Sequence, residues 1–190
     1  MRLRAWRTLA VLAAVAAFGA EVPRPAPDLA IPLPSGQSIR TADCKGKIVV
    51  VEFLLTSCPG CQNAARILTR LRAEYASRGF EVIGVATNAD AEKDIGNFIR
   101  KTGATFPVGH RTLDDAKAYL QIPAASSILV PQLVFIDRTG AIRSQHGSED
   151  QFFFLEEERN IRREIEALLS ENKAPAKAAR AAVPARPRKP

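Results

Sequence analysis

The residues of this sequence best suited to chemistry are two cysteines, Cys58 and Cys61, separated by Pro59 and Gly60. A Cys-x-x-Cys pair can exchange electrons with other thiols by opening and closing a disulfide. The same bond would add little stability to a fold, because it closes a very short loop of chain. The spacing therefore indicates a redox-active dithiol, although half of a zinc site has the same spacing.

A zinc site would need four ligands, and the further candidates are Cys44, His110 and His146. None of them belongs to a second closely spaced pair, so the redox interpretation is favoured. Cys44 is expected to be a free or half-buried thiol, with a regulatory or intermolecular disulfide as the alternative. The two histidines are expected to be structural or surface residues. The sequence indicates neither a metal nor a cofactor.

The place of Cys58 in the chain predicts which thiol attacks first. It follows an apolar run and two polar residues, Thr56 and Ser57, and it opens a helix whose first turn suits Pro59. Backbone N–H groups at a helix N-terminus favour an anion, so they favour the reactive thiolate. Cys61 should lie deeper and be less ionised. We therefore expect Cys58 to attack a substrate disulfide and Cys61 to resolve the mixed disulfide.

Alternating strand and helix patterns surround this pair. Residues 47–55 form a nearly continuous apolar and β-branched run, which is typical of a strand buried on both faces of a parallel sheet. Apolar residues then recur at helical spacing from 61 to 79. A second strand is predicted at 81–86 and a second helix at 90–101. This alternation predicts an α/β fold with a central mixed sheet flanked by helices.

The second half of the chain continues the pattern, and an antiparallel pair is expected at one edge of the sheet. Ser148 and Gln151 have the spacing of a capping box, which places the start of the last helix at Ser148. The elements predicted here are a short strand at 106–108, a helix at 113–120, strands at 132–137 and 141–145, and a helix at 148–172.

The composition of the two ends differs from that of the body, and this sets the predicted domain boundaries. Before the central strand, 30–33 and 38–40 are predicted to form a β-hairpin. The predicted organisation is a signal peptide at 1–20, a Pro-rich extended lead-in at 21–28, one domain at 29–172 and a disordered Ala/Pro/Lys/Arg tail at 173–190.

The first twenty residues have the pattern of a secretory signal. Three Arg precede an apolar run at 9–20 that ends in small residues. The run is shorter than the roughly 20 apolar residues of a membrane span, so an uncleaved anchor is the alternative. The pattern predicts a periplasmic or otherwise extracytoplasmic protein that contacts a membrane only if the segment is retained.

The net charge of +7 comes from the two ends of the chain. Residues 1–20 hold three Arg and no acid, and residues 171–190 hold six Lys or Arg against one Glu. The 150 residues between them carry 18 basic and 19 acidic side chains. A basic groove for nucleic acid is therefore not expected, and the tail is predicted to be a solubilising segment, with partner binding as the alternative.

The strand, the Cys-x-x-Cys and the helix together resemble thioredoxin, and the region 26–169 is similar to the exported TlpA/ResA-like thiol–disulfide oxidoreductases. Glu52, six residues before Cys58, stands where thioredoxins carry a buried acid that exchanges a proton with the second cysteine. Val130 and Pro131, followed by the strand at 132–137, match the cis-proline loop that packs against the disulfide. The resemblance implies a thioredoxin-like fold, with a raised pKa for a buried Glu52.

Two departures bear on the activity that the resemblance implies. Ser57 stands where the family usually has Trp, and Pro59-Gly60 reverses the order of the thioredoxin dipeptide. Both alter the surroundings of the thiols, and the redox potential spans about −270 to −120 mV across this fold. Reduction of protein disulfides by a monomer, with a redox partner protein as electron source, is expected from the resemblance alone. A disulfide oxidase or isomerase is the nearest alternative.

Two more distant alternatives share the fold. Peroxiredoxins place Pro seven and Thr three residues before the reacting cysteine, whereas Val51 and Leu55 precede Cys58 at those positions, and Leu54 and Cys58 precede Cys61. Exported copper-binding modules use Cys-x-x-x-Cys with a distant histidine, so the spacing here is one residue short. Neither pattern is matched.

Overall fold

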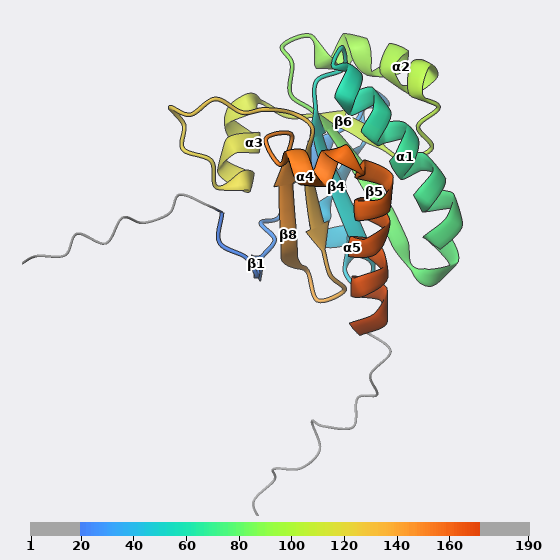
Figure 1. Cartoon of the computed structure of the whole chain (residues 1–190). Coiled ribbons are helices and arrows are strands. Elements are labelled where there is room, and N and C mark those ends of the chain that lie inside the picture. Colours follow the sequence, from blue (N-terminus) through green and yellow to red (C-terminus); the bar gives the residue numbers. More distant parts are fainter. Residues whose placement is uncertain (1–19, 172–190) are drawn as a thin grey trace, which may run out of the picture.

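The computed structural model describes residues 20–171, so the predicted signal at 1–20 (apart from Ala20) and the predicted tail at 173–190 lie outside the described residues. The main sheet has the strand order β1-β8-β7-β4-β5-β6 (Figure 1). β4, β5 and β6 run parallel, while β7 and β8 are antiparallel to their neighbours. The strands are β1 (Arg24–Pro25), β4 (Ile48–Leu54), β5 (Phe80–Ala86), β6 (Val108–His110), β7 (Gln132–Ile136) and β8 (Ala141–Gly147).

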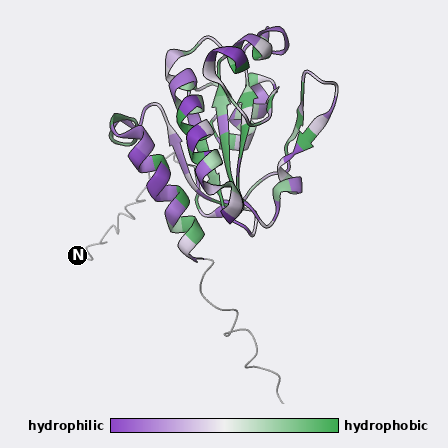
Figure 2. Ribbon diagram, turned by 90° about the vertical axis from the view of Figure 1, so that its right-hand side faces the viewer, coloured by the Kyte–Doolittle hydropathy of each residue, from purple (hydrophilic) through white to green (hydrophobic). Residues whose placement is uncertain are grey.

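Helices cover both faces of this sheet, as the alternating pattern predicts. One apolar layer lies between the sheet and α1 (Pro59–Tyr75), α2 (Ala91–Thr102) and α5 (Glu157–Glu171). The other lies between the sheet and α3 (Leu113–Leu120), with the hairpin and the short 3₁₀ helix η1 (Thr41–Cys44). Figure 2 shows the apolar strands enclosed by helices whose outer faces are polar.

The predicted hairpin is present as a separate two-stranded sheet of β2 (Ala30–Pro32) and β3 (Ser38–Arg40). The lead-in also contributes a strand to the main sheet, because β1 within it pairs with β8. β6 begins two residues later than predicted, and a 3₁₀ turn, η2 (Ala76–Arg78), follows α1. The remaining strands and helices up to β8 lie within two residues of their predicted positions.

The prediction of one helix from Ser148 to Asn172 is wrong. The chain forms α4 (Gln151–Leu155) and α5, separated at Glu156, whose backbone leaves the helical region. Asp150, and not Ser148, caps α4, because its side chain accepts the N–H of Phe153 at 3.1 Å. The buried amide of Asn160 donates to the carbonyls of Phe152 and Phe153, so these groups are satisfied without a continuous helix.

Candidate active site

The loop between β4 and α1 carries the cysteine pair at the carboxyl edge of the parallel strands. β4 is buried along its whole length, because its apolar side chains contact both layers of helices. Asn88 accepts hydrogen bonds from the Thr56 N–H and hydroxyl at 3.1 and 3.3 Å, and Gln62 donates to the Thr56 carbonyl at 3.0 Å. These bonds fix the loop immediately before Cys58.

Cys58 is the N-cap of α1, with Pro59 in the first turn. Its Sγ accepts the backbone N–H of Cys61 at 3.4 Å, which is the orphan donor that an N-cap side chain normally satisfies. Its thiol is partly exposed and lies 3.9 Å from the Val130 carbonyl oxygen. A thiolate at this position would receive a helix N–H and remain open to a substrate.

Cys61 is fully buried beneath Cys58, one turn into the helix. Burial raises the pKa of the Cys61 thiol strongly, and the hydrogen bond with the Cys58 thiol raises it further. Cys44, Cys58 and Cys61 are all free thiols, so the pair is in its dithiol form. Cys58 is thus the more exposed cysteine and Cys61 the buried one, which agrees with their predicted roles as attacking and resolving thiols.

The Val130–Pro131 peptide bond is cis, and Pro131 is buried against the cysteine loop. A Cβ placed on Gly60 would lie 3.5 Å from Pro131 Cδ and 3.8 Å from the Cys58 sulfur, so the proline forms a wall beside the pair. Ser57, Pro59 and Gly60 are exposed around Cys58. Their roles in the reaction stay predictions.

Glu52 lies on β4 with an exposed fraction of zero. Neither of its carboxyl oxygens has a hydrogen-bond partner among residues 20–171. Burial raises the pKa of Glu52 well above its ordinary value, and the charges of Glu157 and Cys58 raise it further. Glu52 and Cys61 also interact electrostatically, and the effect on Cys61 is to raise its pKa. The structure therefore brings Glu52 to the cysteine pair as a carboxyl whose burial favours the protonated form.

Glu157 is a second carboxyl at the site that the sequence did not single out. It begins α5, and its Oε2 accepts a hydrogen bond at 2.8 Å from Asn63, two residues after Cys61. Burial raises the pKa of Glu157, and the Asn63 bond partly offsets this. In the sequence it is the middle of three consecutive glutamates, a pattern typical of a solvated surface, so no local signal marks it.

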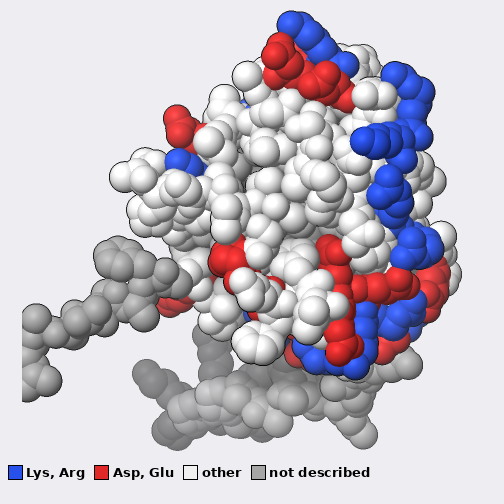
Figure 3. Space-filling model, turned by 45° about the horizontal axis from the view of Figure 1, so that its top comes forward, with Lys and Arg blue, Asp and Glu red and all other residues white. Residues whose placement is uncertain are grey.

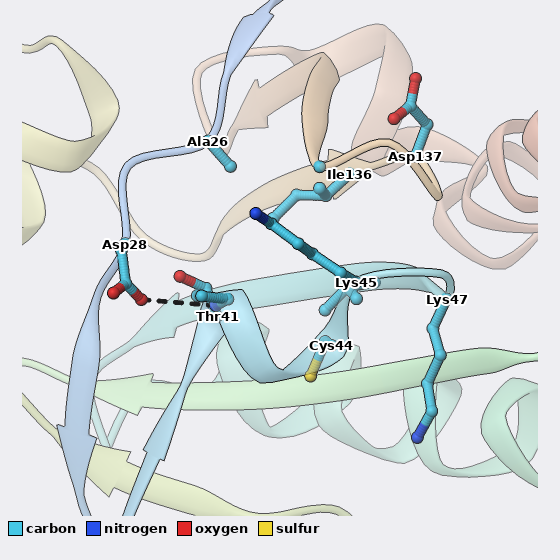
Figure 4. A pocket seen from close by; sticks show the side chains of 11 residues that line it. Ala26, Asp28, Thr41, Cys44, Lys45, Lys47, Ile136 and Asp137 are labelled. Atoms are coloured by element: carbon cyan, nitrogen blue, oxygen red, sulfur yellow. Dashed lines mark hydrogen bonds between the residues drawn. The ribbon is translucent and has the colours of Figure 1, made fainter.

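Cys44 is not part of this site. It lies in η1 before the start of β4, whereas Cys58 follows the end of β4. Figure 4 shows it at a pocket lined also by Asp28, Lys45 and Asp137, with a volume of about 110 Å³. Burial raises the pKa of the Cys44 thiol. Cys44 is a free thiol, as expected, and its side chain is buried.

The two histidines also lie apart from the cysteine pair in the sheet, His110 at the end of β6 and His146 on β8. His146 Nδ1 lies 2.9 Å from Asp150, and its ring stacks on Phe153 with centroids 3.9 Å apart. The role of His146 is therefore structural. Its partner, Asp150, was not predicted from the sequence. Within residues 20–171, His, Cys, Asp and Glu side chains nowhere gather in threes around a position suited to a metal ion.

Solved structures with the same arrangement identify the fold. A thiol:disulfide interchange protein of the thioredoxin family from Chlorobium tepidum TLS superimposes with a TM-score of 0.63 at 23% identity, over 78% of this chain and 98% of that one. A thiol:disulfide interchange protein from Bacteroides sp. gives 0.62 at 21% identity, over 85% and 95%. The class defined by these likenesses is that of the thioredoxin-fold proteins.

Sequence relatives agree with this class. Thiol-disulfide oxidoreductase ResA of Bacillus thuringiensis subsp. konkukian is 31% identical over 140 residues, 72% of this chain and 76% of that protein. ResA of Halalkalibacterium halodurans is 31% identical over 96 residues, so the match spans only 54% of that relative's length. A sequence profile of the AhpC/TSA family matches residues 22–145, and the chain belongs to this family. Among residues 20–171, no helix has the length and apolar character needed to cross a membrane.

Proposed function

We propose that this protein reduces disulfide bonds in other proteins, using Cys58 as the nucleophile and Cys61 as the resolving thiol. The observation that carries the proposal is the asymmetry of the pair. Cys58 is partly exposed and its sulfur receives the N–H of Cys61, whereas Cys61 is fully buried. Attack by the exposed sulfur followed by attack from the buried one is the order that this geometry supports.

The reaction proceeds in two balanced steps. The Cys58 thiolate attacks one sulfur of the substrate disulfide, which forms a mixed disulfide and releases one substrate thiolate, protonated by solvent. The carboxylate form of Glu52 then takes the proton of Cys61, and the Cys61 sulfur attacks Cys58. The Cys58–Cys61 bond forms, the bond from Cys58 to the substrate breaks, and the second substrate sulfur leaves as a thiolate that solvent protonates. Two electrons pass from the cysteine pair to the substrate, and a redox partner must restore them.

The surface around the site supports a polypeptide substrate. Figure 3, in which the top of Figure 1 comes forward, shows a wide uncharged area with basic side chains along one border and acidic ones above and below it. Leu129, next to Val130, is 56% exposed, and Phe152 and Leu155 on α4 are 91% and 82% exposed. Apolar side chains at this exposure fit contact with unfolded or extended protein segments.

The proposal includes an extracytoplasmic site of action, as a monomer that contacts a membrane only through an uncleaved N-terminal segment. The support for export is the pattern of Arg residues and apolar run at 1–20. Its partners are protein disulfides and a dithiol protein that supplies electrons. Fractionation of cells that express the full chain, followed by sequencing of the mature N-terminus, tests both export and cleavage.

The direct test is reduction of insulin by the wild-type protein and three single variants. Cys58→Ser should lose activity by at least a hundredfold, because no other exposed thiol borders the cis-proline within residues 20–171. Cys61→Ser should accumulate mixed disulfides with substrate, visible on a non-reducing gel. Cys44→Ser is the matched control and should retain activity, since it lies in a separate pocket. Equal trapping by the Cys58 and Cys61 variants would contradict the assigned roles.

The direction of electron flow is tested by equilibrium with glutathione. A strongly reducing potential supports the reductase, and a potential near the oxidising end of the range for this fold would instead support an oxidase or isomerase.

A peroxidase is the second candidate, and the match to the AhpC/TSA family favours it. Against it, Val51 and Leu55 stand where the peroxiredoxin signature would have Pro and Thr before Cys58. Hydrogen peroxide consumption coupled to a thiol donor separates the two. Turnover that Cys58→Ser abolishes would establish the peroxidase, and its absence would leave the reductase.

A further inference from the structure

Two carboxyl groups lie behind the cysteine pair, and only one of them reaches solvent. Glu52 is completely enclosed, and both of its oxygens lack a hydrogen-bond partner within residues 20–171. A sealed carboxylic acid that is protonated cannot take a proton from Cys61 until it has given its own away. The resolving step assigned to Glu52 therefore needs a path for that first proton.

Glu157 is placed to provide the path. Its Oε1 is buried and has no hydrogen-bond partner within residues 20–171, while Oε2 is held by Asn63 at 2.8 Å. The residue also lines a solvent-open groove of about 480 Å³ between α1 and the α4–α5 break. One oxygen of the Glu157 carboxyl is thus buried in the protein, while the groove that the residue lines is open to water.

The other charged groups near Glu52 and Glu157 are either the two cysteines or are paired with one another. Glu52 interacts electrostatically with Cys58 and Cys61 on α1 and with Glu157 on α5. The strands on either side of β4 pair Leu133 and Gly84 with it. At the groove rim the charges are paired with each other, in the ion pairs Arg70–Glu158 and Arg159–Glu156.

We propose that Glu157 is a positioning residue for the resolving step, which moves protons between Glu52 and the solvent in the α4–α5 groove. This inference rests on the proposed dithiol function, and it deepens the part played by Glu52. The Glu52 carboxylic acid gives its proton to the Glu157 carboxylate, which releases it to water. The Glu52 carboxylate then accepts the Cys61 thiol proton while the Cys61 sulfur attacks Cys58, and the departing thiolate takes a proton from water.

The test follows the resolving step alone, with the neutral reagent 4,4′-dithiodipyridine and a Cys44→Ala background so that only the pair reacts. The first equivalent of thiopyridone reports attack by Cys58, and the second reports resolution by Cys61. Both phases are measured from pH 5 to pH 9 at two buffer concentrations. The variants are Glu157→Gln, which keeps size and an acceptor for Asn63, and the matched control Glu156→Gln, on the exposed neighbour.

Glu157→Gln should slow the second phase about five- to tenfold and make it dependent on buffer concentration, while the first phase is unchanged. The inflection of Glu52 should move to lower pH, because the negative charge that raises its pKa is gone. Glu156→Gln should match the parent in all respects.

A second phase that keeps its parent rate in Glu157→Gln would overturn the inference, even if the inflection moved, since that would show electrostatic contact without proton transfer. Equal slowing of both phases would also overturn it, since it would indicate a structural defect. Failure of the proposed function would look different, because both phases would remain with this reagent while insulin was not reduced.

Discussion

At the scale of single residues, burying the side chain of Glu52 is costly. Its carboxyl has no water contact and no hydrogen-bond partner within residues 20–171, so the charged form is strongly disfavoured and the pKa is raised. The unfolded chain releases this proton near the ordinary value of 4.5, but the folded protein retains it. Stability from this group is therefore complete below that pH and is lost as the pH rises through the native pKa.

Glu52→Gln should remove this pH dependence. Relative to the variant, the free energy of unfolding of the reduced wild type should fall by about 1.4 kcal/mol for each pH unit between 4.5 and its native pKa. Urea unfolding at pH 5, 7 and 9 measures the difference. Glu156→Gln, at an exposed position, should give a constant offset. A wild-type minus Glu52→Gln difference that is the same at all three pH values would contradict the buried carboxyl.

The burial of Glu52 could be predicted from sequence, because the residue stands inside a run of apolar side chains that only a fully covered strand explains. Glu157 could not be predicted in the same way. Its depth depends on where α5 begins and how it packs on α1, and a run of three glutamates contains neither piece of information.

At the scale of elements, the break between α4 and α5 decides where Glu157 lies. In a helix that continued without interruption from Ser148, the side chain of Glu157 would point in a different direction. The break depends on Asn160, whose amide satisfies carbonyls seven and eight residues earlier. Helical periodicity continues on both sides of the break, so the sequence pattern gives one helix where the chain makes two. The strands were predictable because buried β-branched runs are short and bounded by turn residues.

The cap of α4 can be tested directly by substitution. Asp150→Ala removes the bond to the Phe153 N–H and should lower the free energy of unfolding by about 1 kcal/mol. Asp150→Asn keeps the acceptor and should recover most of the loss. Ser148→Ala is the comparison from the predicted capping box, and it should change stability by less than about 0.5 kcal/mol. Urea unfolding at pH 7 measures all three, and a larger loss for Ser148→Ala would restore the single-helix interpretation.

At the scale of the whole molecule, the hairpin holds the second apolar layer in place at the β6 edge of the sheet. Ile31 on β2 is fully buried in that layer, and the hairpin backbone crosses directly over Gly109. The hairpin itself could be predicted from its turn. Its docking could not, because the contact joins segments almost 80 residues apart and the sequence signal is a single glycine inside a short strand.

Gly109→Ala should therefore destabilise the whole domain. A Cβ at this position would collide with the Pro32 carbonyl oxygen and the Ile31 side chain, and a backbone oxygen cannot rotate away. The expected loss is about 1–3 kcal/mol in the free energy of unfolding, measured by urea, with faster amide exchange in the hairpin. Gly96→Ala is the matched control. It lies exposed within α2 with only the flexible Arg100 side chain nearby, and it should gain about 0.5–1 kcal/mol. Equal stability of the Gly109 variant and the wild type would mean that the hairpin moves away from β6 without cost and does not hold the layer.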